Sequence, residues 1–246
     1  MTFRRLARGL PILLALAPWP ALADVTATYK AGIDRLTVEV ADNGDARVQI
    51  DDVIYVRHGG EEYVTFGKFA GMAISGRRDD MLEFLRVMFR AAGKTPAPPA
   101  PAGAAPRLEP LGATDVLGLK GQIWRIWPAG KRDPADSIEA AFTDSPRLAP
   151  VNRALRSAAT GFFDTFAPLD KRGRFSAALT AMAEKGAPLM IGDAKTVQLL
   201  AVNFGPIAPA RFAVPKDLSS PEELRSIARE MEEKRQEEKR NWGETR

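Results

Sequence analysis

The chain has 246 residues, no cysteine, and 35 basic against 31 acidic residues. The lack of cysteine excludes disulfides, thiolate catalysis and cysteine-ligated zinc. Residues 1–23 hold three of the basic residues and none of the acidic ones, which leaves 32 against 31 in the rest of the chain. A protein so close to neutral has no basic surplus for neutralising phosphates, so nucleic acid is not an expected partner.

The first residues have the three parts of a secretory signal peptide. Three arginines precede a short apolar run over 10–16, and Ala21-Leu22-Ala23 supplies an A-x-A cleavage site. The apolar run is shorter than the roughly 20 residues that cross a bilayer, which disfavours the alternative of an uncleaved anchor. We therefore expect cleavage after Ala23 and a periplasmic protein that starts at Asp24 and has no stable membrane anchor.

Residues 24–66 have the pattern of β-hairpins. Apolar and polar residues alternate over 36–40 and again over 46–50, which places one face of each strand on a core. Asn43-Gly44 between these runs is a two-residue turn signal. The pattern predicts a meander with strands at 24–31, 36–40, 46–50, 53–57 and 63–66, and a weaker strand around 72–75.

A helix is predicted from Asp79 to just before Gly93, because its apolar residues recur at helical spacing. Residues 94–106 are almost all alanine, proline and glycine. Such a composition cannot form a packed core and predicts an extended linker.

The second half is predicted to begin with a strand over 122–127, whose two tryptophans face opposite sides. A short helix is expected from Asp133, a longer one from Ser145 with an apolar stripe over 148–166, and a third ending at Gly186. Further strands are expected at 189–191, 197–204 and 212–214, followed by a charged helix that a capping box at Ser220 begins.

These elements predict an α+β fold, with a bent, mostly antiparallel, half-barrel-like sheet and helices packed over one face. The meander alone has one apolar face and no second layer, so it needs the later helices to cover it. We therefore expect a single domain over 24–218 that contains the linker at 94–106, and a charged C-terminal helix and tail over 219–246.

No motif in the chain indicates catalysis, a cofactor or a metal site. The only histidine, His58, lies in a glycine-rich stretch, and the acidic pairs lie where hairpin turns favour aspartate. The patterns of phosphate-binding loops, nucleophile elbows and serine–lysine dyads are not met. We expect a protein without enzymatic activity, cofactor or bound metal.

One group of apolar residues is a candidate lining for an internal cavity. The long helix stripe is expected to pack across the sheet face that carries one of the two tryptophans. An aromatic stripe fills a core more often than it lines a pocket, so a filled core stays the alternative. The candidate lining residues are Trp124, Trp127, Leu155, Phe162 and Phe166.

The order of elements resembles secreted bacterial proteins that share the lipoprotein-carrier (Lol-type) fold. The resemblance rests on the signal peptide, on the hairpin over 36–45 with Asp42-Asn43-Gly44-Asp45, and on the late segment Phe212-Ala213-Val214-Pro215. It implies a strongly bent antiparallel sheet whose open side is closed by helices over an apolar cavity. No functional residue is carried over from it.

The sequence leaves three functions open. We expect an exported, envelope-associated interaction or accessory protein; the alternatives are a carrier for an apolar or lipid-bearing ligand and a histidine-independent hydrolase. The expected partners are a lipid or an envelope protein. An inner cavity favours the carrier, a filled sheet with an exposed apolar patch favours the accessory protein, and two buried acids with opposed pKa shifts favour the hydrolase.

Overall fold

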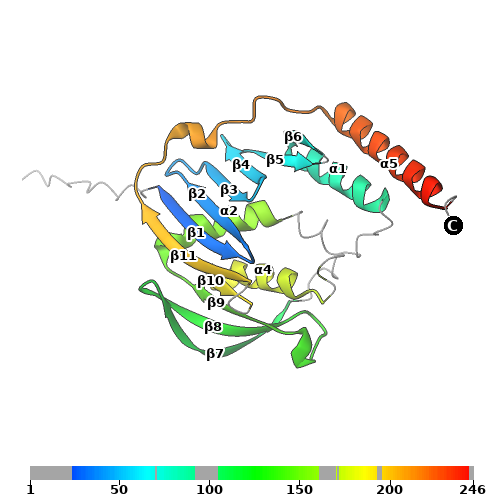
Figure 1. Ribbon diagram of the computed structural model, residues 1–246. Coiled ribbons are helices and arrows are strands. Elements are labelled where there is room, and N and C mark those ends of the chain that lie inside the picture. The colour runs from blue at the N-terminus through cyan, green and yellow to red at the C-terminus, as the bar shows by residue number, and fades with distance from the viewer. Residues whose placement is uncertain are drawn as a thin grey trace, which may run out of the picture.

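The computed structural model describes residues 24–69, 71–91, 105–160, 170, 172–192 and 196–243. Its centre is one antiparallel sheet of eleven strands in the order β6-β5-β4-β3-β2-β1-β11-β10-β9-β8-β7. The two edge strands, β6 and β7, do not pair with each other, so the sheet stays open. Figure 1 shows the sheet bending around helices on its inner side. The predicted α+β class and the half-barrel-like sheet are confirmed.

The strands and helices have the following bounds. The strands are β1 (Val25–Ala31), β2 (Asp34–Val40), β3 (Ala46–Ile50), β4 (Val53–His58), β5 (Glu61–Phe69), β6 (Met72–Arg77), β7 (Arg107–Val116), β8 (Leu119–Trp127), β9 (Ile138–Thr143), β10 (Ala187–Ile191) and β11 (Val197–Phe204). The α-helices are α1 (Arg78–Ala91), α2 (Ala149–Ala159), α4 (Arg174–Lys185) and α5 (Pro221–Gly243).

Strands β1 to β6 form the predicted meander, in which each strand pairs with the next. The β2–β3 turn lies at Asn43-Gly44 as predicted, but it is a loop over residues 41–45 rather than a two-residue turn. Gly44 adopts a left-handed φ of 91°, and the Asn43 side chain accepts a hydrogen bond of 2.9 Å from the Asp45 backbone. The first strand also pairs with the last, from Val25 with Phe204 to Ala31 with Val197. This pairing joins the two halves of the chain into one sheet.

The helices α2 and α4 cover the inner face of the sheet (Figure 1). Helix α2 packs on β1, β2, β3 and β10, and α4 packs on β8, β9 and β10. Helix α1 lies against β5 and β6, and α5 packs on α1 through the buried side chains of Leu224 and Ala228. The capping box that begins α5 is confirmed, since Ser220 and Glu223 exchange hydrogen bonds of 2.7 and 3.2 Å.

Two strands, β7 and β9, are missed by the sequence patterns. Strand β7 contains Pro110 and Gly112, which disfavour a strand, but both are tolerated here because β7 is an edge strand with an irregular register at this point. Strand β9 follows directly on a single 3₁₀ turn at Pro134–Asp136, where a short helix was expected. The alternation of apolar and polar residues in β9 is weak, because four consecutive residues of the six are buried.

The predicted strand at 212–214 is wrong. A 3₁₀ helix over Pro209–Phe212 lies there instead, against β3 and β4. Phe212 is buried, and the Arg211 guanidinium donates to both carboxylate oxygens of Glu39, at 2.6 Å from Nη2 and 3.0 Å from Nε. These contacts hold the segment against β3 and β4, so it packs on the sheet and does not form a further strand.

Several predictions fall outside the described residues. They are the signal peptide and its cleavage site after Ala23, most of the linker, and the aromatic residues Phe162 and Phe166. Among the helices of the described residues, none has both the length and the apolar character that a membrane span requires.

Candidate functional site

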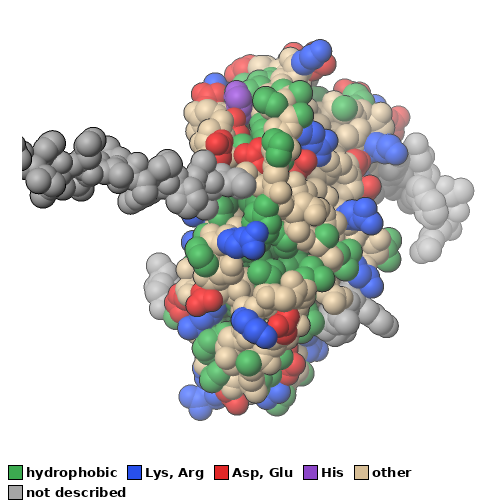
Figure 2. Space-filling view, turned by 90° about the vertical axis from the view of Figure 1, so that its left-hand side faces the viewer, with side chains coloured by type: hydrophobic (Ala, Val, Ile, Leu, Met, Phe, Trp, Pro, Cys, Tyr) green, Lys and Arg blue, Asp and Glu red, His purple; other side chains and the backbone are tan. Residues whose placement is uncertain are grey.

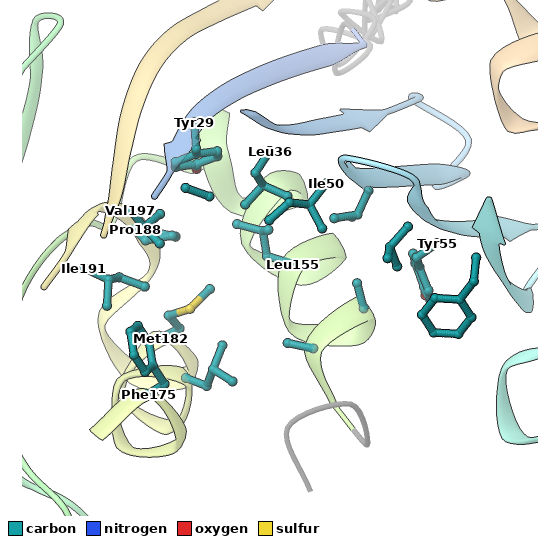
Figure 3. Close-up of a pocket in the computed structure, with 17 residues that line it drawn as sticks. Tyr29, Leu36, Ile50, Tyr55, Leu155, Phe175, Met182, Pro188, Ile191 and Val197 are labelled. Carbon is teal, nitrogen blue, oxygen red and sulfur yellow. The ribbon is translucent and has the colours of Figure 1, made fainter. Parts of the chain in front are cut away.

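A cavity of about 400 Å³ lies between the inner face of the sheet and the helices α2 and α4. Figure 3 shows Leu155 of α2 between Leu36 and Ile50 of the sheet on one side and Phe175 and Met182 of α4 on the other. The described residues that line the cavity are Tyr29, Ala31, Leu36, Val48, Ile50, Val53, Tyr55, Phe66, Leu155, Ala158, Ala159, Phe175, Leu179, Met182, Pro188, Ile191 and Val197.

Helix α2 is most deeply buried along its first turns. Leu148, just before α2, and Val151 and Ala154 within it are completely buried in the core. Further along, Ala158 and Ala159 face the sheet with only a methyl group, and they line the cavity with Leu155. These small side chains border the space, which is large enough for a small molecule.

The sheet side of the cavity follows from the period-two pattern of the meander. Residues at every second position point to the same face, so Tyr29 and Ala31 of β1 share this face with Val53 and Tyr55 of β4. The cavity residues of β1, β3 and β4 lie toward the strand ends at the β1–β2 and β3–β4 turns. The apolar face that the sequence predicts is therefore partly a core and partly a cavity wall.

The lining is almost entirely apolar. None of the described lining residues carries a charge, and their only side-chain hydrogen-bonding groups of ordinary strength are the hydroxyls of Tyr29 and Tyr55. The Tyr55 hydroxyl donates to Glu62 at 2.5 Å. The Tyr29 hydroxyl is buried and has no hydrogen-bond partner among the described residues. The part of the wall that the described residues form is thus suited to an apolar molecule.

A polar cluster joins the C-terminal part of α2 to the sheet beside the cavity. The Glu62 carboxylate accepts hydrogen bonds from Tyr55, from Ser157 of α2, and from Arg78 at 2.7 Å. Arg78 also donates to the carbonyl oxygen of Thr160 at 2.5 Å, just beyond the end of α2. Because a cation at a helix C-terminus satisfies free carbonyls, this cluster holds the end of the helix that covers the cavity.

Opposing effects act on the pKa of Glu62. Burial disfavours the charged carboxylate and by itself raises the pKa, whereas the hydrogen bonds from Ser157, Tyr55 and Arg78 together outweigh burial and hold the pKa below its usual value. Glu62 is therefore ionised at neutral pH, when the cluster is complete. Burial also raises the pKa of the Tyr55 hydroxyl, and the neighbouring Glu62 adds to this effect, so Tyr55 stays a donor.

A second hollow, of about 330 Å³, lies at the start of α1. Its wall carries positively and negatively charged side chains, namely those of Glu61, Glu62, Arg77, Arg78, Asp79 and Asp80. Two of these charges pair directly, since Arg77 lies 3.3 Å from Glu61. No group of three or more potential metal ligands occurs in the described part of the chain. We therefore assign no ligand to this hollow.

The candidate cavity residues of the sequence analysis lie in different places. Leu155 lines the cavity, but Trp124 and Trp127 are not among the lining residues, which is a correction. The Lys185 ammonium lies 4.4 Å from the centre of the Trp124 ring, and the Arg107 guanidinium lies 3.7 Å from that of Trp127. Both tryptophans are on β8, whereas the sheet wall of the cavity is formed by β1–β5, β10 and β11.

His58 is the last residue of β4, directly before the turn at Gly59-Gly60, and pairs with Glu61 rather than lying within the turn. Its Nδ1 atom lies 2.8 Å from Asp45 across the neighbouring hairpin turn, and half of its side chain is exposed. Asp45 also accepts a hydrogen bond from the Gly59 backbone at 3.0 Å. The pair fastens two turns together and lies outside the cavity.

Tyr29, Tyr55 and the Glu62 cluster were not predicted as parts of a site from the sequence. A signal for the tyrosines was present, because each occupies an apolar position of an alternating strand and so points to the inner face. No signal identified Ser157 as a partner of Glu62, since 95 residues separate them. Neither a scan against protein-family models nor a search of curated proteins finds a match to the chain.

Proposed function

We propose that this protein is a binding or carrier module for an apolar or lipid-bearing ligand, which it holds between the sheet and helices α2 and α4. The cavity of about 400 Å³, whose described lining residues carry no charge, is the observation that supports this function. Its size falls within the range of roughly 300–1,000 Å³ that is typical of small-molecule sites. Burial of apolar ligand surface supplies the binding free energy, about 25 cal/mol per Å².

The setting we propose is the periplasm of the exporting cell. The basic start, the short apolar run and the A-x-A site of residues 1–23 support export. An exported protein that encloses apolar surface can carry a molecule that water dissolves poorly. The ligand would enter the cavity from a membrane or from a partner protein.

The accessory-protein hypothesis has weaker support. Two of the most exposed large apolar side chains, Ile33 and Leu117, lie in turns at opposite ends of the sheet and do not form a shared patch. On the face shown in Figure 2, hydrophobic side chains are interspersed with charged ones. An apolar docking surface would be expected to be contiguous.

The hydrolase hypothesis needs a carboxyl group that is held protonated beside one that is ionised. Every described carboxyl group with a resolved shift, namely Asp45, Glu61, Glu62 and Asp115, has its pKa lowered. Each of them accepts hydrogen bonds from neighbouring groups. None of these four supplies the proton donor that such a mechanism requires.

The test of the proposal fills the cavity by substitution. Ala158→Phe places a ring in the space that the alanine methyl leaves, whereas Arg153→Phe adds the same ring at an exposed position of α2. We expect the wild type and Arg153→Phe to bind the fluorescent probe N-phenyl-1-naphthylamine, and Ala158→Phe to bind it at least about tenfold more weakly while remaining folded.

Native mass spectrometry of the protein purified from its own cells provides a second readout. A co-purifying apolar molecule that is retained by Arg153→Phe and lost by Ala158→Phe supports the proposal. If the wild type binds no probe and carries no molecule, or if Ala158→Phe binds as the wild type does, the cavity is not a ligand site.

A further inference from the structure

We propose that the tip of the β1–β2 hairpin, residues 30–35, contacts a phospholipid bilayer. Ile33 inserts among the lipid chains, and the side chains of Lys30 and Arg35 bind lipid phosphates beside it. The contact places the accessible end of the cavity at the membrane surface. That it serves ligand transfer rests on the proposed function, whereas the contact itself does not.

The first observation is where the cavity wall is accessible. Its residues next to the turns, such as Ala31 of β1 and Ile50 of β3, are partly exposed. Two positions further in on the same strands, Tyr29 and Val48 are buried. Leu36 of β2, which Figure 3 shows beside Ile50, is partly exposed as well. The accessible apolar wall therefore lies at the end of the sheet where β1 turns into β2.

The second observation is the apolar residue at the tip itself. Ile33 follows Gly32 in the turn, and its side chain is the most exposed of the large apolar side chains in the described residues. Single exposed apolar residues are common on protein surfaces. This one, however, lies between Ala31 and Leu36, which both line the accessible end of the cavity. Entry of the tip into a bilayer would remove this side chain from water.

The third observation is a pair of cations beside Ile33. Lys30 and Arg35 are exposed and lie directly opposite each other on β1 and β2. Like charges in this arrangement repel, and neither forms an ion pair with another described residue. Asp34 is the only acid among residues 30–35, which leaves the tip a net charge of +1. Lipid phosphates would neutralise the two cations, whose long side chains reach the headgroups while Ile33 inserts.

A bilayer fits these features better than a partner protein does. A protein interface needs a contiguous apolar patch, whereas the tip offers one apolar side chain between charged ones. The next turn at this end of the sheet, Asp51-Asp52, is acidic, so lipid phosphates would repel it. The contact is therefore limited to the tip and weak, which suits a carrier that has to leave the membrane again.

The first experiment measures binding to vesicles of phosphatidylglycerol and phosphatidylcholine in equal parts. The protein lacks residues 1–23, because a signal segment would bind vesicles by itself and every described element follows it. We expect Ile33→Ser to bind at least about tenfold more weakly than the wild type, the effect of one inserted aliphatic side chain. Leu117→Ser is the matched control, since Leu117 is an exposed residue beside a glycine in the turn at the opposite end of the sheet. It should bind as the wild type does.

A second pair of variants tests the cations. Lys30→Gln/Arg35→Gln should bind the same vesicles at least about fivefold more weakly, because each cation near an anionic surface adds to the affinity. Arg225→Gln/Lys234→Gln removes two positive charges from ion pairs on α5 and gives the same net charge. This control should bind as the wild type does. Equal losses in both double variants would show that only the net charge matters and would overturn the assignment to the tip.

A fluorescent label reports on insertion directly. Because the chain has no cysteine, Ile33→Cys and Leu117→Cys can each be labelled at a single site with an environment-sensitive dye. Vesicles should shift the emission of the label at position 33 to shorter wavelength and leave that at position 117 unchanged. Ile33 is fully exposed, so its variants should unfold at the denaturant concentration of the wild type.

The outcomes separate this inference from the proposed function. It is overturned if the wild type binds no vesicles, or if Ile33→Ser and Leu117→Ser bind equally well. Binding of N-phenyl-1-naphthylamine in solution needs no membrane. A wild type that binds the probe but no vesicles keeps the cavity as a ligand site and loses the membrane contact. One that binds vesicles through Ile33 but not the probe keeps the contact and loses the carrier function.

Discussion

At the scale of single residues, the polar groups that this fold buries are mostly paired with partners far away in the sequence. Glu39 shows this on the outer face of the sheet, where it binds Arg211 and lies 3.7 Å from Arg47. Glu62 shows it on the inner face, where it binds Ser157 and Arg78. A buried carboxylate without such partners would be strongly destabilising, so each one fixes the position of a distant segment.

The Glu62 cluster leads to a prediction about pH. The pKa of Glu62 is lower in the folded protein than its ordinary value of 4.5, so the carboxylate stabilises the fold fully above that value and loses its contribution as the pH falls through the folded pKa. Glu62→Gln should therefore cost roughly 2 kcal/mol at neutral pH, the scale of hydrogen bonds to a charged group, and much less at low pH.

Urea unfolding of both proteins at a series of pH values checks this prediction. The difference in free energy of unfolding between wild type and Glu62→Gln should shrink below about pH 4.5, because the carboxyl of the unfolded wild type is protonated first and that of the folded protein at lower pH. Other carboxyl groups titrate in the same range, but they are common to both proteins and cancel. A difference that stays constant down to about pH 3 would show that the charge of Glu62 does not hold α2.

At the scale of elements, the junctions depend on backbone conformations that particular residues allow. Helix α4 ends and β10 begins at Gly186, whose φ of 96° and ψ of −156° lie in a region that is essentially restricted to glycine. A Cβ atom at this position would lie 2.2 Å from the carbonyl oxygen of Thr143. The helix can therefore pass directly into the sheet only because this position has no side chain.

We predict that Gly186→Ala destabilises the protein by more than about 3 kcal/mol, because backbone strain and a clash with a fixed carbonyl add together. Gly130→Ala is the control: this glycine also has a left-handed φ, of 74°, but nothing lies within 4 Å of the added methyl. It should cost only about 1 kcal/mol. Thermal and urea unfolding measure both, and equal losses would contradict the steric explanation.

At the scale of the whole molecule, neither half of the chain can bury its apolar surface alone. Strands β1–β6 come from the first half and β7–β11 from the second, and they join along β1 and β11. Helix α2, from the second half, covers β2 and β3 of the first. The cavity also draws its walls from both halves, so folding and the ligand binding that we propose depend on the same association.

This arrangement predicts the result of cutting the chain between the halves. A protease site introduced within residues 94–104 should allow cleavage into two fragments that remain associated and still bind the apolar probe. Size-exclusion chromatography and probe fluorescence before and after cleavage provide the measurements. Fragments that separate in the absence of denaturant would contradict a single domain.

The sequence predicted most of the strands because their information is local. Alternation over 36–40 and 46–50, the Asn43-Gly44 turn, and the capping box of Ser220 and Glu223 each lie within a few residues, and each appears in the structure. It missed β7, since Pro110 and Gly112 are unfavourable in most strands and are acceptable only at a sheet edge. Which strand lies at an edge depends on the whole sheet.

The inner face was also determined by the sequence, because alternation assigns Tyr29, Leu36 and Tyr55 to one side of the meander. Whether that face borders a filled core or a cavity was decided only by tertiary structure. It depends on where α2 crosses the sheet and on Ala158 facing the strands at that point. A void is the difference between the volume that the elements enclose and the volume that side chains fill, and the first of these quantities exists only once the chain has folded.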